Sequence, residues 1–129
     1  MNLDALVAAA KQAREKAHAP YSNFKVGCAI EDENGRVFTG CNVENASYGL
    51  GLCAERVAVF KAISEGAAKL LRIAVVADTD TLTPPCGACR QILWEFCGDA
   101  ELALENLAGK RETMTVKQIL PRPFDASFL

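Results

Sequence analysis

Apolar residues near the start of the chain recur at intervals of three and four, a spacing that predicts an amphipathic helix over residues 3–18. On such a helix the apolar side chains share one face, and the charged side chains between them fall on the others. Pro20 ends this pattern. We therefore expect a surface helix whose apolar face packs on the rest of the molecule. Its apolar positions are Leu3, Leu6, Val7, Ala10 and Ala13.

Five segments further along the chain have the pattern of β-strands. Between the first two lie residues 32–35, DENG, a sequence that favours a tight hairpin turn. The third segment, LLRIAVVA, is an unbroken apolar run, which is typical of a strand covered on both faces. The last two are weaker, and a polar segment separates them. The five expected strands are residues 25–31, 36–41, 70–77, 101–104 and 113–116.

Two more helices are predicted, at residues 53–65 and 87–97, where apolar residues again recur at helical spacing. A polar segment with glycines, residues 42–51, precedes the first of them, and a short helical turn is expected before Pro121. The order α-β-β-α-β-α-β-β predicts an α/β fold in which helices pack on the faces of a mixed sheet. The chain shows no internal repeat or domain boundary, so we expect a single domain over residues 1–129.

Composition and charge argue against several classes of protein. Half of the residues are hydrophobic and 23% are charged, an ordinary profile for a globular protein. The formal net charge is −2 and no run of basic residues occurs, which argues against a nucleic-acid partner. No apolar run approaches the ~20 residues that cross a bilayer, and charges interrupt residues 3–17, so neither a membrane partner nor a signal peptide is predicted. We expect a cytoplasmic protein.

Six cysteines in a chain without an export signal are better explained as thiols or metal ligands than as disulfides. Cys86 and Cys89 form a CxxC pair in the segment TPPCGAC, and Cys53 precedes an earlier helix. All three lie where a strand or loop enters a helix, and two such junctions can meet at one edge of a sheet. Helix N-termini favour thiolates, and three thiolates around Zn²⁺ leave one tetrahedral position open, as in catalytic zinc sites.

Glu55 and Arg56 follow in the segment CAER, two and three residues after Cys53. If Cys53 starts the helix, Glu55 falls in its first turn, where a carboxylate can take a proton from water at the zinc and deliver it to a substrate nitrogen. Arg56 is placed to hydrogen-bond thiolate sulfur and to offset the negative charge of three thiolates. We expect Glu55 to be catalytic and Arg56 to tune the electrostatics of the metal.

The CxxC pair alone is also compatible with a redox pair or with a structural zinc site. A redox pair does not need a distant Cys-x-Glu segment, which counts against that explanation. A structural zinc site needs a fourth ligand, for which Cys28, Cys41, Cys97 and His18 are the candidates. The sequence around these three cysteines favours buried free thiols, and His18 stands near the end of a helix. Trp94, on the helix of the CxxC pair, is expected in the core.

The segment CAE at residues 53–55, followed about 30 residues later by PCGAC at residues 85–89, resembles the motif of zinc deaminases. The likeness extends through APYSNFKVGCAI, NVENASYG and LPRPF, and it is closest to the small, homotetrameric, three-cysteine class of cytidine deaminases. This resemblance implies a three-layer α-β-α fold with a mixed five-stranded sheet and one Zn²⁺ per subunit. It also implies hydrolysis of cytidine and 2′-deoxycytidine to uridine and 2′-deoxyuridine with release of ammonia, in pyrimidine salvage.

The same resemblance assigns contacts to the nucleoside. Phe24 resembles an aromatic residue that packs on the nucleoside, and Ala54 resembles a residue whose backbone N–H helps to hold the base. Asn42 and Glu44, in NVEN, resemble the pair that hydrogen-bonds the ribose 3′-hydroxyl, which needs one donor and one acceptor. Phe124, after LPRP, resembles an aromatic residue that closes the site of a neighbouring subunit; Phe128 is a second aromatic in the same segment.

Two rival functions stay open on the sequence. A deaminase of a modified cytosine nucleoside, such as blasticidin S, shares the zinc motif, but NVEN together with Phe24 favours a plain nucleoside. A non-enzymatic zinc-binding module has protein ligands at all four coordination positions. The negative charge of Glu44 near the sugar disfavours a phosphorylated substrate.

Overall fold

The computed structural model describes residues 2–129. Helix α1, Leu3–Arg14, begins after Asn2, whose Oδ1 accepts a hydrogen bond of 2.8 Å from a backbone N–H in the first turn. The apolar face of α1 is buried, as predicted. The helix ends before residue 18 because His18 pairs with another segment: its N–H donates to the carbonyl of Asn42 at 3.0 Å.

Five strands form one sheet, and they are β1 Val26–Asp32, β2 Val37–Cys41, β3 Leu70–Ala77, β4 Glu101–Glu105 and β5 Arg111–Thr115. Their order across the sheet is β2-β1-β3-β4-β5. β3 and β4 are parallel, and the other three pairs are antiparallel. The turn between β1 and β2 has Gly35 at φ 79°, the left-handed conformation that a tight hairpin requires. The prediction of a mixed five-stranded sheet is confirmed.

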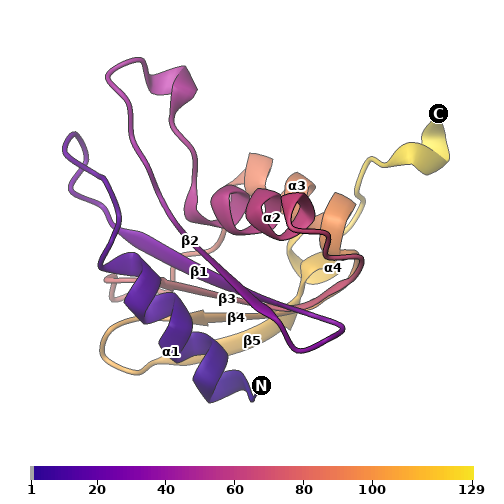
Figure 1. Ribbon diagram of the computed structural model, residues 1–129, viewed down its shortest axis with the longest axis horizontal. Helices are drawn as coiled ribbons and strands as arrows, with labels where there is room; N and C mark the ends of the chain where they lie inside the picture. The colour runs from indigo at the N-terminus through magenta and orange to yellow at the C-terminus, as the bar shows by residue number, and fades with distance from the viewer. Residues whose placement is uncertain (1) are drawn as a thin grey trace.

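The other helices lie on the face of the sheet opposite α1 (Figure 1). They are α2 Ala54–Ser64, α3 Gly87–Cys97 and the short α4 Val116–Ile119. Two 3₁₀ turns, η1 Tyr48–Leu50 and η2 Ala126–Phe128, precede α2 and follow α4. The predicted three-layer α-β-α arrangement is therefore confirmed. Within residues 2–129, no helix has the length and apolar character needed to span a bilayer.

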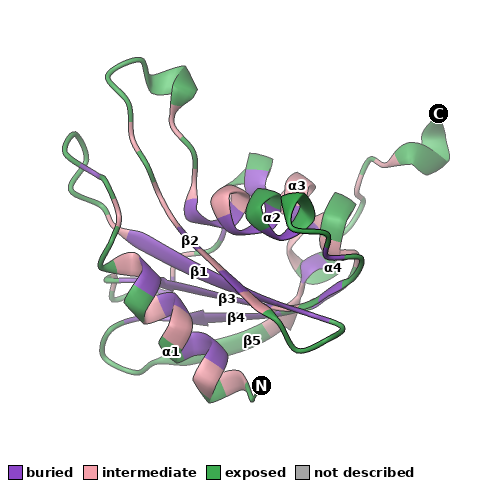
Figure 2. Ribbon diagram, in the orientation of Figure 1, coloured by how far each residue is buried: buried purple, intermediate pink, exposed green. Residues whose placement is uncertain are grey.

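Each face of the sheet has its own apolar core. Figure 2 shows the central strands buried almost throughout, and every residue of β1 is buried. On the α1 side, Leu6, Val7 and Ala10 pack on small and branched residues of the inner strands. The core on the other side is larger and includes Val59, Ile73, Leu93, Leu102 and Val116. Covering on both faces explains why β3 is a continuous apolar run in the sequence.

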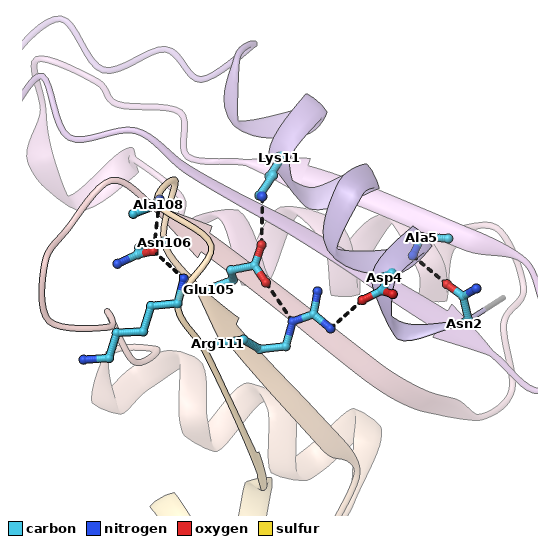
Figure 3. A network of polar contacts seen from close by, with 9 residues as sticks. Asn2, Asp4, Ala5, Lys11, Glu105, Asn106, Ala108 and Arg111 are labelled. Carbon is cyan, nitrogen blue, oxygen red and sulfur yellow. Dashed lines mark hydrogen bonds and ion pairs between the residues drawn. The ribbon is translucent and has the colours of Figure 1, made fainter.

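A charged network fastens α1 to the edge of the sheet at β4 and β5 (Figure 3). Glu105, at the end of β4, is buried and pairs with Lys11 Nζ at 2.8 Å and with Arg111 Nε at 2.7 Å. Arg111 in turn pairs with Asp4 at 2.7 Å. Because both oxygens of the buried carboxylate have a cationic partner, its desolvation is compensated. The network fixes where α1 lies on the sheet.

The boundary between β5 and α4 differs from the expected strand at residues 113–116. β5 begins earlier, because the Asn106 side chain accepts a hydrogen bond of 2.9 Å from the N–H of Lys110 and closes a tight connection to β4. β5 also ends earlier, because Val116 is the first residue of α4. The Gln118 side chain accepts a hydrogen bond of 2.8 Å from the N–H of Thr115 and so caps this helix.

Two glycines let the helices lie close to the sheet. A Cβ atom at Gly27 would lie 2.0 Å from the carbonyl oxygen of Ala10, in α1. A Cβ atom at Gly40 would lie 2.5 Å from the backbone nitrogen of Ala58 and 2.6 Å from the carbonyl oxygen of Ala54, both in α2. These neighbours are backbone atoms of packed helices, so neither can move aside without a shift of the helix. Gly40 therefore sets the distance between the sheet and α2.

We expect the Gly40→Ala substitution to lower the free energy of unfolding by about 1–3 kcal/mol, because the added methyl group forces α2 away from β2. Chemical denaturation, with the midpoint and slope both fitted, measures this loss. Gly49→Ala is the matched control, since no atom lies within 4 Å of a Cβ at that position. Equal stability of the two variants would show that the spacing of α2 does not depend on Gly40.

Candidate active site

Three cysteine thiols meet where α2 and α3 begin. Cys53 is the N-cap residue of α2 and Cys86 is the N-cap residue of α3, while Cys89 lies in the first turn of α3. Neither cysteine side chain accepts a capping hydrogen bond from the backbone of its own helix. The three Sγ atoms all lie within 4.8 Å of one another. The structure thus joins two helix starts that are more than thirty residues apart in sequence.

The donor set fits one zinc ion. Three sulfurs at about 2.3 Å from a tetrahedral zinc lie about 3.8 Å from one another, so the observed cluster needs to contract only slightly. In residues 2–129 no further cysteine, histidine or carboxylate joins this group. The candidates for a fourth ligand, Cys28, Cys41, Cys97 and His18, are therefore not part of it. Three protein ligands leave the fourth position open, which is the arrangement of a catalytic zinc site.

The environment of Cys53 favours the thiolate form, whereas the hydrogen bond with Cys53, together with burial, raises the pKa of Cys89 above its usual value. A hydrogen bond with the Cys89 thiol, opposed in part by burial, lowers the pKa of Cys53 to about 5. Arg56 acts in the same direction, since its Nη2 donates to the Cys53 sulfur at 3.4 Å. Arg56 Nε is buried and has no protein partner among the described residues. A positive group that faces sulfur in this way offsets part of the charge that three thiolates bring to a metal.

Glu55 lies beside the thiol cluster without belonging to it. It is the second residue of α2, its side chain is 4% exposed, and it hydrogen-bonds with Cys89. Burial raises the pKa of the Glu55 carboxyl above its usual value, and the nearby Cys53 sulfur acts in the same direction. A carboxyl group with a raised pKa binds protons more strongly, which suits a group that must accept and return them near neutral pH.

The loop between β2 and α2 places further side chains next to this cluster. Val43 and Leu52 pair through two backbone hydrogen bonds of 3.0 and 2.9 Å, so residues 42–52 form a narrow arm that returns the chain to Cys53. Figure 1 shows this arm projecting beyond the body of the molecule. A cavity of about 470 Å³ lies along this arm. The residues that line this cavity include Tyr21, Ser22, Asn42, Glu44, Tyr48, Cys53 and Arg56.

Asn42 and Glu44 both brace the segment between α1 and β1. Asn42 accepts a hydrogen bond of 2.9 Å from the N–H of Val26 and donates one of 2.7 Å to the carbonyl of Phe24. Glu44 accepts hydrogen bonds from the N–H of Tyr21 and from the N–H and hydroxyl of Ser22. The Ser22 hydroxyl contributes most to the lowered pKa of Glu44. The sequence predicted that these two side chains bind a sugar. It did not predict that they also hold the segment between α1 and β1 in place.

The other expected site residues lie in different surroundings. Ala54 is fully buried at the first position of α2, where a backbone N–H has no acceptor within the helix. Phe24 is 41% exposed and is not part of the cavity lining. Phe124 is 59% exposed, on the C-terminal segment that extends away from the 42–52 arm (Figure 1). One copy of the chain therefore gathers the cysteines, Glu55 and Arg56, but leaves Phe124 apart.

Arg90 is a residue of this site that the sequence pattern did not reveal. Its Nε donates to the carbonyl of Pro85 at 2.8 Å, and its Nη1 donates to the carbonyl of Ile119 at 3.0 Å. Pro85 directly precedes Cys86, one of the three clustered thiols. The guanidinium of Arg90 therefore holds the loop that presents this thiol. An arginine directly after CxxC is a weak signal, because its acceptors are backbone atoms that any sequence provides.

We expect the Arg56→Gln substitution to weaken zinc affinity by about 10–100-fold, because the thiolates lose a charged hydrogen-bond partner. Competition with a chromophoric chelator measures the affinity of each variant. Lys61→Gln is the matched control, since it removes one positive charge from the same helix at a position outside the cavity lining. If both variants retain zinc equally well, Arg56 has no electrostatic part in metal binding.

Comparison with known proteins gives consistent results. Residues 1–104 match the model of the family described as cytidine and deoxycytidylate deaminase zinc-binding region. The chain is 51% identical over 127 residues to a cytidine deaminase of Halalkalibacterium halodurans, covering 98% of this chain and 96% of that one. It is 48% identical over 125 residues to a cytidine deaminase of Sporosarcina psychrophila, covering 96% and 92%.

Solved structures agree with these relatives. The crystal structure of a cytidine deaminase from Burkholderia pseudomallei superposes with a TM-score of 0.93 at 50% identity, over 96% of this chain and 100% of that one. A cytidine deaminase from Mycobacterium tuberculosis superposes with a TM-score of 0.83 at 40% identity, over 97% and 98%. At these identities the likeness extends to the sequence as well as to the fold.

Proposed function

The chain belongs to the cytidine and deoxycytidylate deaminase family, and on this premise we propose that it hydrolyses cytidine and 2′-deoxycytidine to uridine and 2′-deoxyuridine, with release of ammonia. The convergence of three thiols with a buried carboxyl at their side supports this function most directly. The same arrangement argues against a non-enzymatic zinc module, which has no use for an open coordination position or a buried glutamate. We place one zinc ion in each chain and one catalytic domain over residues 1–129.

Each residue of the site has a distinct task. Cys53, Cys86 and Cys89 would hold the zinc ion, which would supply a Lewis acid that makes water nucleophilic near neutral pH. The carboxylate of Glu55 would take up the two protons of the attacking water one after the other, passing one to the ring nitrogen of the pyrimidine and one to the amino group that leaves as ammonia. Arg56 balances the charge of the thiolates. Glu55 is buried, so its carboxyl group lies away from bulk solvent.

The cavity beside the cluster supports a nucleoside as the substrate. Asn42 and Glu44 line it and offer an amide donor and a carboxylate acceptor for a sugar hydroxyl. The Ala54 N–H, at the start of α2, is the donor that we assign to the base, and Phe24 is the aromatic that we assign to the nucleoside. A substrate phosphate near Glu44 meets a carboxylate whose pKa is already lowered, so the two repel each other. We therefore propose nucleosides rather than nucleotides.

A substrate panel tests this function. The loss of ultraviolet absorbance is followed as cytidine, 2′-deoxycytidine, cytidine monophosphate and blasticidin S are each offered to the zinc-loaded protein. We expect turnover of the first two and none of the monophosphate. Selective turnover of blasticidin S would identify a deaminase of modified nucleosides, and inertness toward all four would contradict the proposed function.

We propose that the protein acts as a cytoplasmic homotetramer in pyrimidine salvage, and that a neighbouring subunit completes each site. Phe124 supports this assembly, because its exposed ring is not part of the cavity lining of its own chain and lies on a segment that extends away from the 42–52 arm (Figure 1). Phe60 and Phe96, on the outer side of α2 and α3, are also partly exposed and pack edge to face. Aromatic surface of this kind is typical of the centre of a protein interface.

We expect Phe124→Ala to raise KM for cytidine by about ten- to thirtyfold and to leave zinc bound, because it removes an aromatic anchor from the neighbouring site. Steady-state kinetics and metal analysis measure both effects. Mixing Phe124→Ala chains with Glu55→Gln chains should restore part of the activity, since a mixed interface can contain one intact site. A monomer with full activity in size-exclusion chromatography would refute completion by a neighbour.

A further inference from the structure

The C-terminal segment after α4 is held by side chains of α3, the helix that carries two of the three thiols. Gln91 Nε2 donates to the carbonyl of Phe124 at 2.6 Å, and Arg90 holds the carbonyl of Ile119 near the start of the segment. Pro121 and Pro123 lie between these two contacts and have no backbone N–H to donate. The segment therefore depends on side chains of α3 for its path.

A third contact of this kind joins two side chains. Trp94 lies one turn beyond Arg90 on α3, and its Nε1 donates to Asp125 Oδ2 at 3.0 Å. Sequence reasoning expected Trp94 in the core; its ring does pack at the edge of the core, but its N–H points to the C-terminal segment. Unlike the contacts to carbonyl groups, this one requires particular residues at both positions. A hydrogen bond between a neutral donor and a carboxylate is also stronger than a neutral pair.

Asp125 connects this contact to the aromatic rings of the segment. Its Oδ1 accepts a hydrogen bond of 3.0 Å from the N–H of Ser127 and so caps the last 3₁₀ turn, η2. That turn brings the Phe128 ring onto the Phe124 ring, with centroids 5.6 Å apart and planes inclined by 14°. Both rings are more than half exposed, so they present a stacked aromatic pair to a neighbour.

We propose that Trp94 and Asp125 form a latch, and that this latch positions the Phe124–Phe128 pair for the active site of a neighbouring subunit. The proposal rests on the completion of each site by a neighbour, as proposed above. Trp94 and Asp125 are positioning residues: they do not touch the substrate, and they act through the two rings. Because the two rings stack on each other, the latch positions both of them.

Fluorescence tests whether the latch forms in solution. Trp94 is the only tryptophan of the chain, so the tryptophan emission comes from this position. We expect Asp125→Ala to shift the emission maximum or change its intensity, since the indole N–H loses a charged partner. Asp4→Ala is the matched control: it removes another aspartate with a side-chain partner, on α1, which lies on the opposite face of the sheet from α3 (Figure 1). Identical spectra for all three proteins would overturn the latch.

Kinetics test its function. We expect Trp94→Phe and Asp125→Ala each to raise KM for cytidine about tenfold, the value of one hydrogen bond to a charged group, with kcat within about twofold of the unaltered protein. Zinc content should stay unchanged, and Asp4→Ala should alter neither constant. The double variant should be no worse than the more affected single variant, because both changes break the same contact.

The outcomes distinguish failure of the latch from failure of the proposal that a neighbouring subunit completes each site. If Phe124→Ala raises KM but Trp94→Phe and Asp125→Ala do not, the latch is wrong and completion by a neighbour stands. If none of the three raises KM, completion by a neighbour is itself wrong and the latch falls with it. Loss of zinc or of kcat at an unchanged KM would mean that Trp94 acts only in the structure of α3, which also overturns the latch.

Discussion

The Glu55→Gln variant should keep its zinc and lose turnover by about 10²–10⁴-fold or more, the contribution of a general acid–base group that serves several proton transfers. Glutamine has the shape of glutamate and can fill the same buried position at the start of α2, but it cannot carry a proton. Metal analysis and initial rates with saturating cytidine measure the two properties. The expected result is a folded, zinc-loaded protein that is nearly inactive.

Glu65→Gln is the matched control for this variant. Glu65 follows the last residue of the same helix and is exposed, so its replacement changes the charge of α2 equally without touching the site. We expect this control to have the turnover of the unaltered protein. If the Glu55→Gln protein had the same turnover as the control, the assignment of Glu55 as the proton carrier would be wrong.

Replacing any one of Cys53, Cys86 and Cys89 with alanine should abolish zinc binding and turnover together. Each removes one of three thiols, and two thiols with two solvent positions make a much weaker site. Elemental analysis after dialysis against a chelator measures the metal that each variant retains. Thermal unfolding, recorded in parallel, shows whether the fold survives the loss.

The other cysteines supply the controls. Cys28 is fully buried, and burial contributes most to its raised pKa, so it stays a thiol and a poor metal ligand. Cys97 is half-buried with its pKa raised to about 12 for the same reason, and Cys41 lies on β2 outside the cluster. Alanine at each of these positions should leave one zinc per chain. Loss of zinc in any of them would contradict the ligand set.

For elements with strong local patterns, the sequence predicted the first and last residues correctly. β3 is one, because an apolar run covered on both faces has clear ends, and α3 is another, because the proline-rich loop fixes where it starts. The end of α1 and the boundary between β5 and α4 were misplaced. In both cases a contact outside the local pattern decides the structure: the pairing of His18 with Asn42, and the cap that Gln118 provides for α4.

The candidate site shows the same difference between features set by local motifs and features set by contacts between distant residues. The convergence of the three thiols and the place of Glu55 in the first turn of α2 follow from short motifs with fixed spacing, and sequence reasoning found them. The brace between Glu44 and Ser22 and the contact between Trp94 and Asp125 join residues 22 and 31 positions apart. Neither contact has a periodic signal, because both depend on where loops pass one another after the sheet and helices have packed.

Zinc titration of the metal-free protein, with cytidine deamination measured at each step, tests the central claim most directly. If the three thiols hold the metal that the reaction needs, the rate rises in proportion to bound zinc and reaches its plateau at one equivalent per chain. Full activity in the metal-free protein, or a chain that holds one equivalent of zinc and leaves cytidine unchanged, would contradict the account.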